Sequence, residues 1–462
     1  MSHPLDERLA AVLPSGSLFA VGGRVRDELR AEIERVAVAG KDRDYVVVGH
    51  SFAELREALE RIGRVDLVGA SFAVIKLSVE GETVDVSLPR RERSVGVGHR
   101  DFDVESGPDV PLRDDLARRD FRMNMIARAL PSGELIDPYE GRADIAARRI
   151  DILTGDAFNE DPLRMLRAAQ FAARFGYGVS DQARSAMAAA APLVRSVSAE
   201  RVAEELTKLF VRAPQPSIGL ELLRETGVLA HVWPELLEGD GIEQNEWHAH
   251  DVYRHNLATV DAIAAGDLIA RLAALLHDVG KPRVKDGPHF YRHEHVGADL
   301  VVAMLERYRF AGDVVTATEH LVRQHMYSQD PALGDAAIRR FIRRIGVANL
   351  RRQFALRHAD IAGSGLPKRD DSNERFEARV WAEVARKPAF SVKDLQIDGA
   401  AVIDTMVRRG QAAPGFRGDR RVGEALAYLF EQVTDAPERN ERNTLQTLLE
   451  QYLDAHRGAG RA

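Results

Sequence analysis

Apolar positions along the chain follow two different periods, and the change between them falls near residue 150. In the N-terminal part, short apolar runs at residues 18–21, 42–48, 72–79 and 82–87 predict β-strands. Apolar residues three or four positions apart at 1–13 and 22–30 predict helices beside them. This part is therefore expected to contain a mixed sheet with helices.

Beyond residue 150 the pattern is helical almost throughout. The stretches 160–175, 182–233, 336–357, 390–430 and 441–456 carry apolar residues at helical spacing. Two polar stretches, 239–246 and 362–373, interrupt the pattern and mark boundaries. We predict an α+β fold with a mixed head and all-α remainder, divided at 1–150, 151–238, 239–365 and 366–462.

The composition is that of an ordinary water-soluble protein. Hydrophobic residues make up 45% and charged residues 29% of a 462-residue chain, which is too long for one typical core. There is no cysteine, which excludes disulfides and thiolate sites and is compatible with a cytoplasmic location. The start carries acidic residues rather than the apolar core of a signal peptide, and no apolar run is long enough to span a membrane. The net charge of −7 argues against a protein that coats nucleic acid broadly.

The first candidate site combines a Gly-Gly turn with a pair of acidic residues. Residues 21–27 read V-G-G-R-V-R-D, and residues 41–49 read K-D-R-D-Y-V-V-V-G. Period two on a strand places Asp42 and Asp44 on one face, where they can hold divalent cations against a triphosphate. The glycines let backbone amides, together with Arg26, approach phosphates. Each motif alone is equally typical of a tight turn or an edge strand, but their conjunction predicts a nucleotidyl-transfer site. Asp85 is either a third acid or an ordinary strand residue.

Two further polar motifs lie between the head and the neck. R-R-D-F-R-M-N at 118–124 offers Arg119 and Asn124 to a nucleotide, or else a helix-start ion pair. E-D-P-L-R-M-L-R at 160–167 spaces Asp161, Arg164 and Arg167 three apart, which predicts one helix face. Carboxylate acceptors beside guanidinium donors can read the Watson–Crick edge of a base, and an ion-pair ladder is the alternative. The Arg- and Gly-containing stretch 90–111 is expected to be a mobile loop beside the site.

Histidines and aspartates gather in the third predicted domain. His277 and Asp278 close an apolar helix, with His255 upstream and Asp360 downstream. Imidazole and carboxylate ligands together suit divalent metals. We expect these four residues to bind a divalent metal, of undetermined identity, that supports phosphoester cleavage. A satisfied core histidine is the alternative for each imidazole, and His293 and His325 are candidates for a second ion.

The four motifs of the head and neck, in this order, resemble those of bacterial class II tRNA nucleotidyltransferases, the CCA-adding enzymes. The H…HD…D pattern resembles the HD domain fused to many of them. The resemblance implies a polymerase-β-like nucleotidyltransferase head followed by an all-α neck, an HD domain and a helical tail. It implies template-independent addition of C-C-A to the 3′ end of tRNA from CTP and ATP, with a phosphohydrolase activity in the HD domain.

The resemblance also implies roles for individual residues. Asp42 and Asp44 would bind Mg²⁺, and the nucleotide contacts would come from Gly23, Arg26 and Arg119, with Asp161, Arg164 and Arg167 as the amino-acid template. The chain departs from the common pattern at Gln170, at Arg122 and in the longer connection 31–40. None of these departures removes a carboxylate, so the chemistry is expected to be retained.

Two other functions fit part of the pattern. A poly(A) polymerase of the same superfamily would share the head motifs. A metal phosphohydrolase whose head only senses nucleotides would rely on the histidine site instead. The sequence leaves the oligomeric state open.

Overall fold

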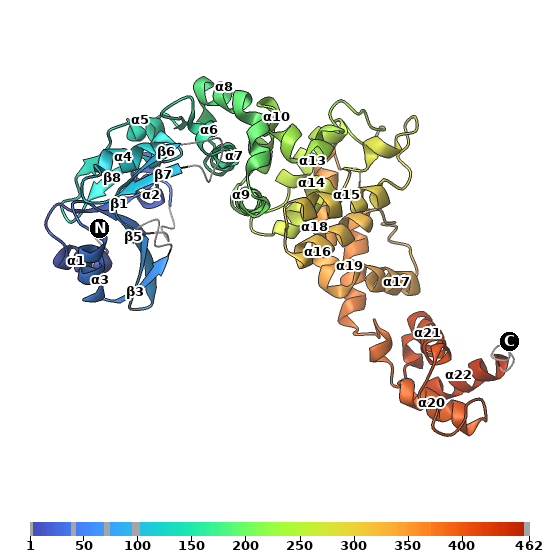
Figure 1. The fold of residues 1–462 in the computed structure, drawn as a ribbon. Helices are drawn as coiled ribbons and strands as arrows, with labels where there is room; N and C mark the ends of the chain where they lie inside the picture. The colour runs from blue at the N-terminus through green and yellow to red at the C-terminus, as the bar shows by residue number, and fades with distance from the viewer. Residues whose placement is uncertain (1–2, 38–42, 69–73, 95–101, 369, 457–462) are drawn as a thin grey trace. The chain divides into compact units, whose positions relative to one another are not determined.

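The computed structural model describes residues 3–37, 43–68, 74–94, 102–368 and 370–456 (Figure 1). The described chain divides into two compact units. One contains Met1–Ile242 with Val260–Arg271 and Ala303–Gly312, and the other contains Glu243–Thr259 with Leu272–Val302 and Asp313–Ala462. Among the described residues, no helix combines the length and the apolar character that crossing a bilayer requires.

A seven-stranded mixed sheet forms the centre of the head. Its order is β3-β4-β5-β2-β1-β8-β9, in which only the β2–β5 pair is parallel. Side chains alternate between its two faces, as in β4, where every second residue is buried. The strands are β1 (Leu18–Val21), β2 (Asp44–Val47), β3 (Arg64–Val68), β4 (Val74–Val79), β5 (Glu82–Ser87), β8 (Ala127–Ala129) and β9 (Leu135–Ile136).

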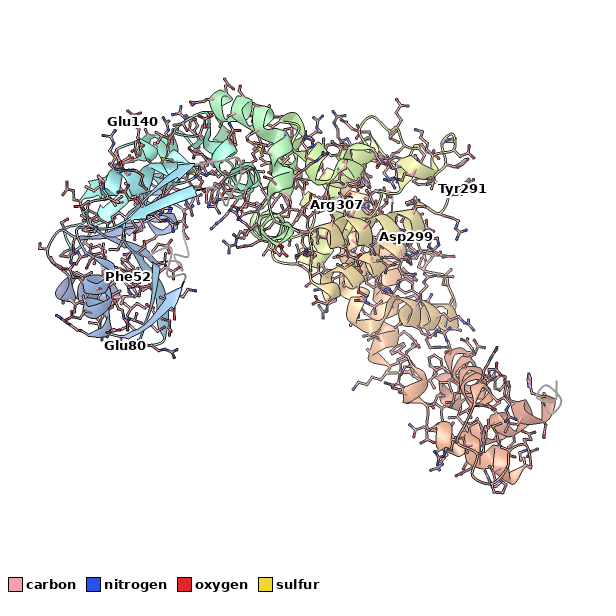
Figure 2. The ribbon with its side chains drawn as sticks, in the orientation of Figure 1. Phe52, Glu80, Glu140, Tyr291, Asp299 and Arg307 are labelled. Atoms are coloured by element: carbon pink, nitrogen blue, oxygen red, sulfur yellow. The ribbon has the colours of Figure 1, made fainter. Side chains whose placement is uncertain are left out.

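Short helices connect the strands of the head. Phe52 begins one of them, and Glu80 lies in the turn between β4 and β5 (Figure 2). Apolar side chains from β1, β2 and β8 pack with a buried leucine and methionine of the connecting segments into one core. The helices are α1 (Pro4–Val12), α2 (Gly23–Glu34), α3 (Phe52–Glu60), α4 (Leu112–Ala117) and α5 (Gly141–Ala146).

The prediction of a loop at 90–111 is wrong at residues 90–94 and 102–106, whereas residues 107–111 belong to no helix or strand. β6 (Arg90–Ser94) and β7 (Phe102–Ser106) pair antiparallel as a separate two-stranded ribbon. Residues 95–101 between them lie outside the described residues. Backbone hydrogen bonds between the two strands form whatever the side chains are, so a polar sequence does not reveal this pairing.

The neck is helical, as its period predicts. Its two best packed helices approach closely at Gly219, where a β-carbon would lie 2.7 Å from the carbonyl oxygen of Ala169. Glycine is therefore required by the spacing of these helices. The neck contains α6 (Ala157–Glu160), α7 (Leu163–Phe175), α8 (Asp181–Ala190), α9 (Ala199–Arg212), α10 (Pro216–Glu225), α11 (Leu229–Val232) and α12 (Pro234–Leu237), with a short parallel pair of β10 (Arg149–Ile150) and β11 (Gly178–Val179).

The rest of the described chain is helical, and its C-terminal helices share an apolar core of their own. The helices are α13 (Val252–Asp261), α14 (Leu268–Leu276), α15 (His293–Arg307), α16 (Gly312–Arg323), α17 (Asp335–Ile345), α18 (Leu350–Gly363), α19 (Ser372–Ala385), α20 (Gly399–Arg408), α21 (Arg420–Asp435) and α22 (Arg442–Ala455). Short 3-10 helices complete the described part of the chain: η1 (Arg122–Asn124), η2 (Ala191–Ser196), η3 (Lys281–Val284), η4 (Val347–Asn349), η5 (Val392–Asp394) and η6 (Pro437–Arg439). The predicted α+β fold class is confirmed.

Candidate functional site

Asp44, the described member of the predicted acidic pair, lies beside the Gly-Gly turn at the end of the central strands of the head sheet. Asp44 begins β2, opposite Val21 at the end of β1 and opposite Asp85 of β5. Residues in register on neighbouring strands point to the same face of a sheet. Asp44 and Asp85 are therefore the two described carboxylates at this position, both half-buried. Asp42 lies outside the described residues.

The turn between β1 and α2 brings a basic side chain to the same place. Gly22 has a φ of +68°, a left-handed conformation that favours glycine. A β-carbon there would lie 2.9 Å from Nη1 of Arg119 and 3.5 Å from Oδ2 of Asp44. The helix amides that follow Gly22, the guanidinium and the carboxylate thus converge, an arrangement suited to a metal-bound phosphate.

Arg26 is placed differently from its expected role at the phosphates. Its side chain is 5% exposed, donates to Asn124 at 3.0 Å and to Asp27 at 2.8 Å, and lies against the rings of Phe171 and Phe175. These contacts connect α2 of the head to α7 of the neck. The described position of Arg26 is that of a connecting residue, and its nucleotide contact stays a prediction.

A chain of hydrogen bonds continues from Asn124 into the neck. Its amide donates to Asp120 at 2.7 Å, and Asp120 accepts from Nε of Arg167 at 2.8 Å. Nη1 of Arg167 reaches Glu205 of α9 at 3.4 Å. Burial alone would raise the pKa of Asp120, but the adjacent Arg167 lowers it. The carboxylate is therefore ionised and holds Arg167 in place.

The predicted template residues do not all share one helix face. Asp161 precedes α7 in an extended conformation, because Pro162 stands between it and the first helical residue. Oδ2 of Asp161 accepts from Arg201 of α9 at 2.8 Å. Arg164, within α7, donates to Glu160 at 3.1 Å and to the carbonyl of Arg118 at 2.6 Å. No local pattern marked Arg201 as a site residue, since it approaches from a different helix.

A pocket of about 330 Å³ extends from Arg119, which lies beside the turn, to Arg164 of the template region. Arg119 and Asp120 line it from the head, and Glu160 and Arg164 line it from the neck. Its volume is at the lower end of small-molecule sites. The pocket therefore places hydrogen-bonding side chains of both signs around a space suited to part of a nucleotide.

Arg122, one of the departures from the common pattern, has a structural explanation. Both ends of its guanidinium donate to the buried carboxylate of Asp144 at 2.7 Å. Asp151 lies 3.2 Å from the same group. Arg122 thus stabilises the base of the head. Gln170, another departure, is buried in α7.

The second unit brings the four predicted metal ligands together. The Nε2 atoms of His255 and His277 are 3.1 Å apart. They lie 3.4 and 3.3 Å from Oδ2 of Asp278, and 3.2 and 3.6 Å from Oδ1 of Asp360. Ligands about 2.1 Å from one ion and about 90° apart would be separated by about 3.0 Å. This donor set therefore fits a single divalent cation.

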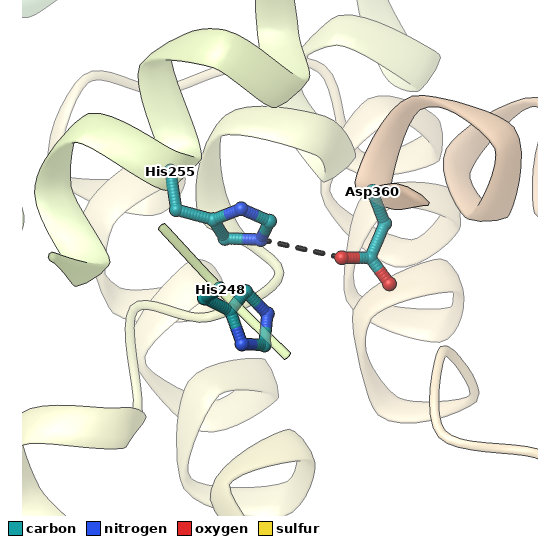
Figure 3. A group of neighbouring side chains, drawn as sticks. All are labelled: His248, His255 and Asp360. Atoms are coloured by element: carbon teal, nitrogen blue, oxygen red, sulfur yellow. Dashed lines mark ion pairs between the residues drawn. The ribbon is translucent and has the colours of Figure 1, made fainter. Parts of the chain in front are cut away.

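His248 joins this group, although the sequence singled out only the other four. It lies beside His255 with ring centroids 4.7 Å apart, and Figure 3 shows both imidazoles with Asp360, which His255 contacts. One ring nitrogen of His248 is close enough to share an ion with His255 and Asp360. Burial, with Lys281 and His255 nearby, lowers the pKa of His248 to about 3, so it is neutral and able to ligate. The signal in the sequence was a histidine just before the helix that carries His255.

Charges around the carboxylates keep them ionised. Burial alone would raise the pKa of Asp278, but His277 and Lys281 hold it well below its usual range. Burial would lower the pKa of His277, whereas Asp278 and Asp360 raise it to about 10. The two carboxylates, Asp278 and Asp360, thus favour a positive charge at His277, and a bound cation would supply that charge instead.

Comparisons with known proteins match three parts of the chain. The sequence matches the family model of the poly A polymerase head domain over residues 18–151. Residues 176–239 match a probable RNA- and SrmB-binding site of polymerase A, and residues 255–374 match the HD domain.

Two curated relatives cover most of the chain. A protein from Cupriavidus metallidurans, described as a multifunctional CCA protein, is 35% identical over 73% of this chain and 82% of its own length. A protein of the same description from Xanthomonas campestris is 34% identical over 89% of this chain and 96% of its own length.

Solved structures share the fold. A CCA-adding enzyme of Bacillus stearothermophilus, solved with CTP, has a TM-score of 0.66 at 21% identity and covers 99% of both chains. A CCA-adding enzyme of Thermotoga maritima, solved with tRNA, has a TM-score of 0.57 at 18% identity and covers 98% of this chain and 96% of that one.

Proposed function

The chain belongs to the family of multifunctional CCA proteins, and on that premise we propose that it adds C, C and A to the 3′ end of tRNA from CTP and ATP. The observation that carries the proposal is the convergence of the Gly22 turn, Asp44 and Arg119 beside a pocket that Arg119 and Arg164 line. A transfer reaction needs a place for the triphosphate next to a place for the base, and this arrangement supplies both. We also infer a cytoplasmic location, where tRNA is matured.

The carboxylates of the head have a specific role in this proposal. Asp42 and Asp44 hold Mg²⁺, and the half-buried Asp85 in register with Asp44 is a third carboxylate beside it. When bound, Mg²⁺ supplies the charge that offsets the triphosphate and orients its α-phosphate. Gly23 contributes an amide at the start of α2, and Arg119 donates to phosphate or ribose oxygens.

The base is selected at the part of the pocket that Glu160 and Arg164 line, next to Asp161 in the sequence. Asp161 accepts from an exocyclic amine, and Arg164 donates to a ring nitrogen or carbonyl. Both side chains are already held, one by Arg201 and the other by Glu160 and the carbonyl of Arg118. Arg167, which donates to Asp120, helps to hold this helix in place. Arg26, which donates to Asn124, links the head to the neck. A pre-organised edge of this kind discriminates bases without a nucleic-acid template.

Incorporation assays test this function against a poly(A) polymerase. Purified protein is incubated with tRNA that ends before CCA, and each labelled nucleotide is supplied alone and then CTP with ATP. The proposed activity gives two added residues with CTP alone and three with CTP plus ATP. Long adenosine tails with ATP alone, and no addition from CTP, would assign the chain to poly(A) synthesis.

A second activity is favoured by the metal-ligand set of the HD domain. We propose that His255, His277, Asp278 and Asp360 hold a divalent metal and that the domain hydrolyses phosphoesters, with 2′,3′-cyclic or terminal phosphates as the substrate class. When bound, the metal supplies a polarised water and a Lewis acid for the phosphoryl oxygen. Arg357, which donates to Oδ2 of Asp360 at 2.9 Å, orients that carboxylate.

Hydrolysis of a 2′,3′-cyclic nucleotide tests the second activity. Protein stripped of metal and reloaded with Mn²⁺, Co²⁺ or Ni²⁺ is expected to release the ring-opened phosphate. Asp360→Asn is expected to lower this rate at least about 10-fold, because removing even an outer partner of a ligand costs 10–100-fold. An unchanged rate in that variant would place the hydrolysis elsewhere.

A further inference from the structure

A pocket of about 470 Å³ is formed by residues of α18 and α19, both in the second unit. The side chains around it combine aromatic rings with a guanidinium, an imidazole and a carboxylate. Small-molecule sites typically have such walls, mostly apolar and aromatic with a few polar groups. The residues that line the pocket are Arg351, Phe354, Ala355, His358, Glu377 and Trp381.

The pocket and the HD metal site use different faces of α18. Arg351, Ala355 and His358 are four and three residues apart, which places them on one face of the helix. Asp360, the metal ligand on this helix, follows His358 by two residues, or about 200° of helical rotation. The pocket is therefore a separate site, and the chemistry proposed for the HD metal does not account for it.

The indole of Trp381 is held in place by three contacts. Its Nε1 donates to Oε1 of Glu377 at 3.1 Å, and its ring centroid lies 6.2 Å from that of Phe354. The guanidinium of Arg351 lies 5.6 Å from the centre of the same indole. Trp381 is nevertheless only half-buried, and it lines the pocket. A rigid aromatic face of this kind can stack a planar ring at little cost in conformational entropy.

The polar groups of the pocket wall are hydrogen-bonded to one another. Oε2 of Glu377 lies 2.7 Å from Nε2 of His358, and the amide nitrogen of Asn373 lies 3.1 Å from Nδ1 of the same imidazole. An amide nitrogen can only donate, so Nδ1 accepts and Nε2 donates to Glu377. These bonds leave the aromatic face as the main surface for a ligand, which favours stacking over recognition of one particular base.

Arg351 brings a positive charge to this pocket. It is exposed, and within the described part of the chain its guanidinium takes part in no ion pair. Neighbouring arginines differ, since Arg357 pairs with Asp360 and Arg375 pairs with Asp371. An arginine beside an aromatic ring can bind a phosphate while a base stacks on the ring. A nucleotide unit of RNA offers both groups.

We propose that this pocket takes an unpaired base of the tRNA, with the base stacked on Trp381 and the adjoining phosphate bound by Arg351. The inference rests on the proposed transfer function, which makes tRNA the substrate. The 3′ end of the tRNA enters the transfer site of the first unit, so the base bound here comes from a loop of the tRNA. Bases in loops are accessible for stacking on aromatic side chains, unlike those inside a duplex.

Binding to RNA with and without unpaired bases tests the proposal. The protein is titrated into fluorescently labelled tRNA that ends before CCA, and into a blunt RNA duplex of similar length. Trp381→Leu is expected to weaken binding to the tRNA at least about 5-fold, the equivalent of one base–aromatic stack, and to leave binding to the duplex unchanged. Trp381→Phe, which keeps an aromatic face, should restore most of the affinity. Circular dichroism of each variant confirms folding.

Arg351→Gln tests the phosphate contact. The affinity for tRNA should fall, and the slope of its logarithm against the logarithm of salt concentration should decrease in size by about one, as expected for one lost phosphate contact. Arg375→Gln is the matched control, because this arginine of α19 is also exposed but pairs with Asp371 outside the pocket. It should change neither quantity.

Crosslinking and kinetics separate this proposal from the transfer function. Ultraviolet light should join a loop nucleotide of the tRNA to a peptide within residues 351–381, identified by mass spectrometry. Trp381→Leu should raise the KM for tRNA in CTP incorporation without changing kcat.

Wild-type tRNA affinity in Trp381→Leu, or an equal loss for the tRNA and the duplex, would overturn base binding in the pocket whether or not the protein incorporates CTP. A crosslink at the pocket of a protein that incorporates no CTP would support base binding and overturn the transfer function instead.

Discussion

Asp6 holds two neighbours of the transfer site. Its carboxylate, 1% exposed, accepts from Arg24 at 2.7 and 2.6 Å and from the hydroxyl of Tyr45 at 2.7 Å. Arg24 follows Gly23, and Tyr45 follows Asp44, so this contact ties the turn to the acidic strand. Burial alone would raise the pKa of Asp6, but Arg24 and Tyr45 lower it to about 2.

We expect Asp6→Asn to lower the free energy of unfolding by about 2 kcal/mol at pH 7, because it removes one of the two carboxylates that pair with the buried Arg24 and leaves only Glu28, at 2.8 Å. The folded-state pKa lies below the unfolded value of about 3.9, so this stability is present above pH 4 and is lost as the pH falls towards 2. Between pH 4 and pH 2, the free energy of unfolding should therefore fall by about 2 kcal/mol less in Asp6→Asn than in the wild type. Urea denaturation at a series of pH values measures both.

Glu80→Gln is the control for Asp6→Asn. Glu80 contacts Arg8 of the same N-terminal helix, but both side chains are exposed. Its loss should cost less than about 1 kcal/mol. Equal effects of the two substitutions would contradict the role given to Asp6.

Arg201 is expected to be a positioning residue for base selection. Its guanidinium donates to Asp161 at 2.8 Å, and no other described contact holds that carboxylate oxygen. Arg201→Gln should raise misincorporation of UTP and GTP relative to CTP about 10-fold, the equivalent of one hydrogen bond to a charged group. Single-nucleotide incorporation assays measure the ratio, and the total rate with CTP should change less than the ratio does.

Arg212→Gln, at the exposed end of the same helix, should leave the selectivity unchanged. Arg201→Lys should restore part of it, because an ammonium can still donate to Asp161. A variant that loses rate for all four nucleotides equally would indicate a purely structural role for Arg201.

At the scale of elements, the neck depends on the close approach of α10 to α7. Gly219→Ala would place a methyl group 2.7 Å from the carbonyl oxygen of Ala169, a backbone atom that can move only with its helix. We expect a loss of about 1–3 kcal/mol in the free energy of unfolding, although alanine is the better helix former. Thermal and urea denaturation measure it.

Gly423 of α21 offers a matched comparison. It is also a helical glycine, but the space around its missing β-carbon is open. Gly423→Ala should therefore stabilise its helix by about 0.5–1 kcal/mol. A stabilising effect of both substitutions would show that the helices of the neck separate easily.

The period of apolar residues predicted the elements that bury an apolar side. The strands expected at 18–21 and 82–87 coincide with β1 and β5, and the helical neck follows its spacing. The β6–β7 ribbon was not predicted, because residues 90–94 read R-R-E-R-S and contain no apolar residue that would indicate a buried face. Asp161 was misplaced on the helix, because residue spacing does not say on which side of Pro162 the helix begins.

The residues of the candidate sites also divide into those that could be predicted from the sequence and those that could not. Motifs whose residues are close in sequence, such as the Gly-Gly turn and His277-Asp278, could be recognised from the order of residues alone. Two partners that approach from elsewhere could not be recognised. Arg201 reaches Asp161 from α9, and His248 comes close to Asp360 of α18, and only the tertiary fold creates these contacts.

At the scale of the whole molecule, the two proposed activities should be separable. The ligands of the transfer site lie in the first unit, and those of the HD site lie in the second. Asp44→Asn should lower CTP incorporation more than about 100-fold and leave cyclic-phosphate hydrolysis intact. His277→Gln should do the opposite. The two assays run on the same preparations provide the measurement.

Each variant serves as the folding control for the other, because each must retain one activity. If His277→Gln also abolished CTP incorporation while its circular dichroism was unchanged, the head would depend on the HD site. The assignment of independent activities would then be wrong.

The contacts of Arg26 have a consequence for how the two ends of the pocket respond when nucleotide enters. Arg26 donates to Asn124 of the head and lies against the rings of Phe171 and Phe175 of α7. A shift of α7 away from the head would leave this buried guanidinium without its partners, which is costly. The turn after β1 and the helix that follows Pro162 should therefore move as one body.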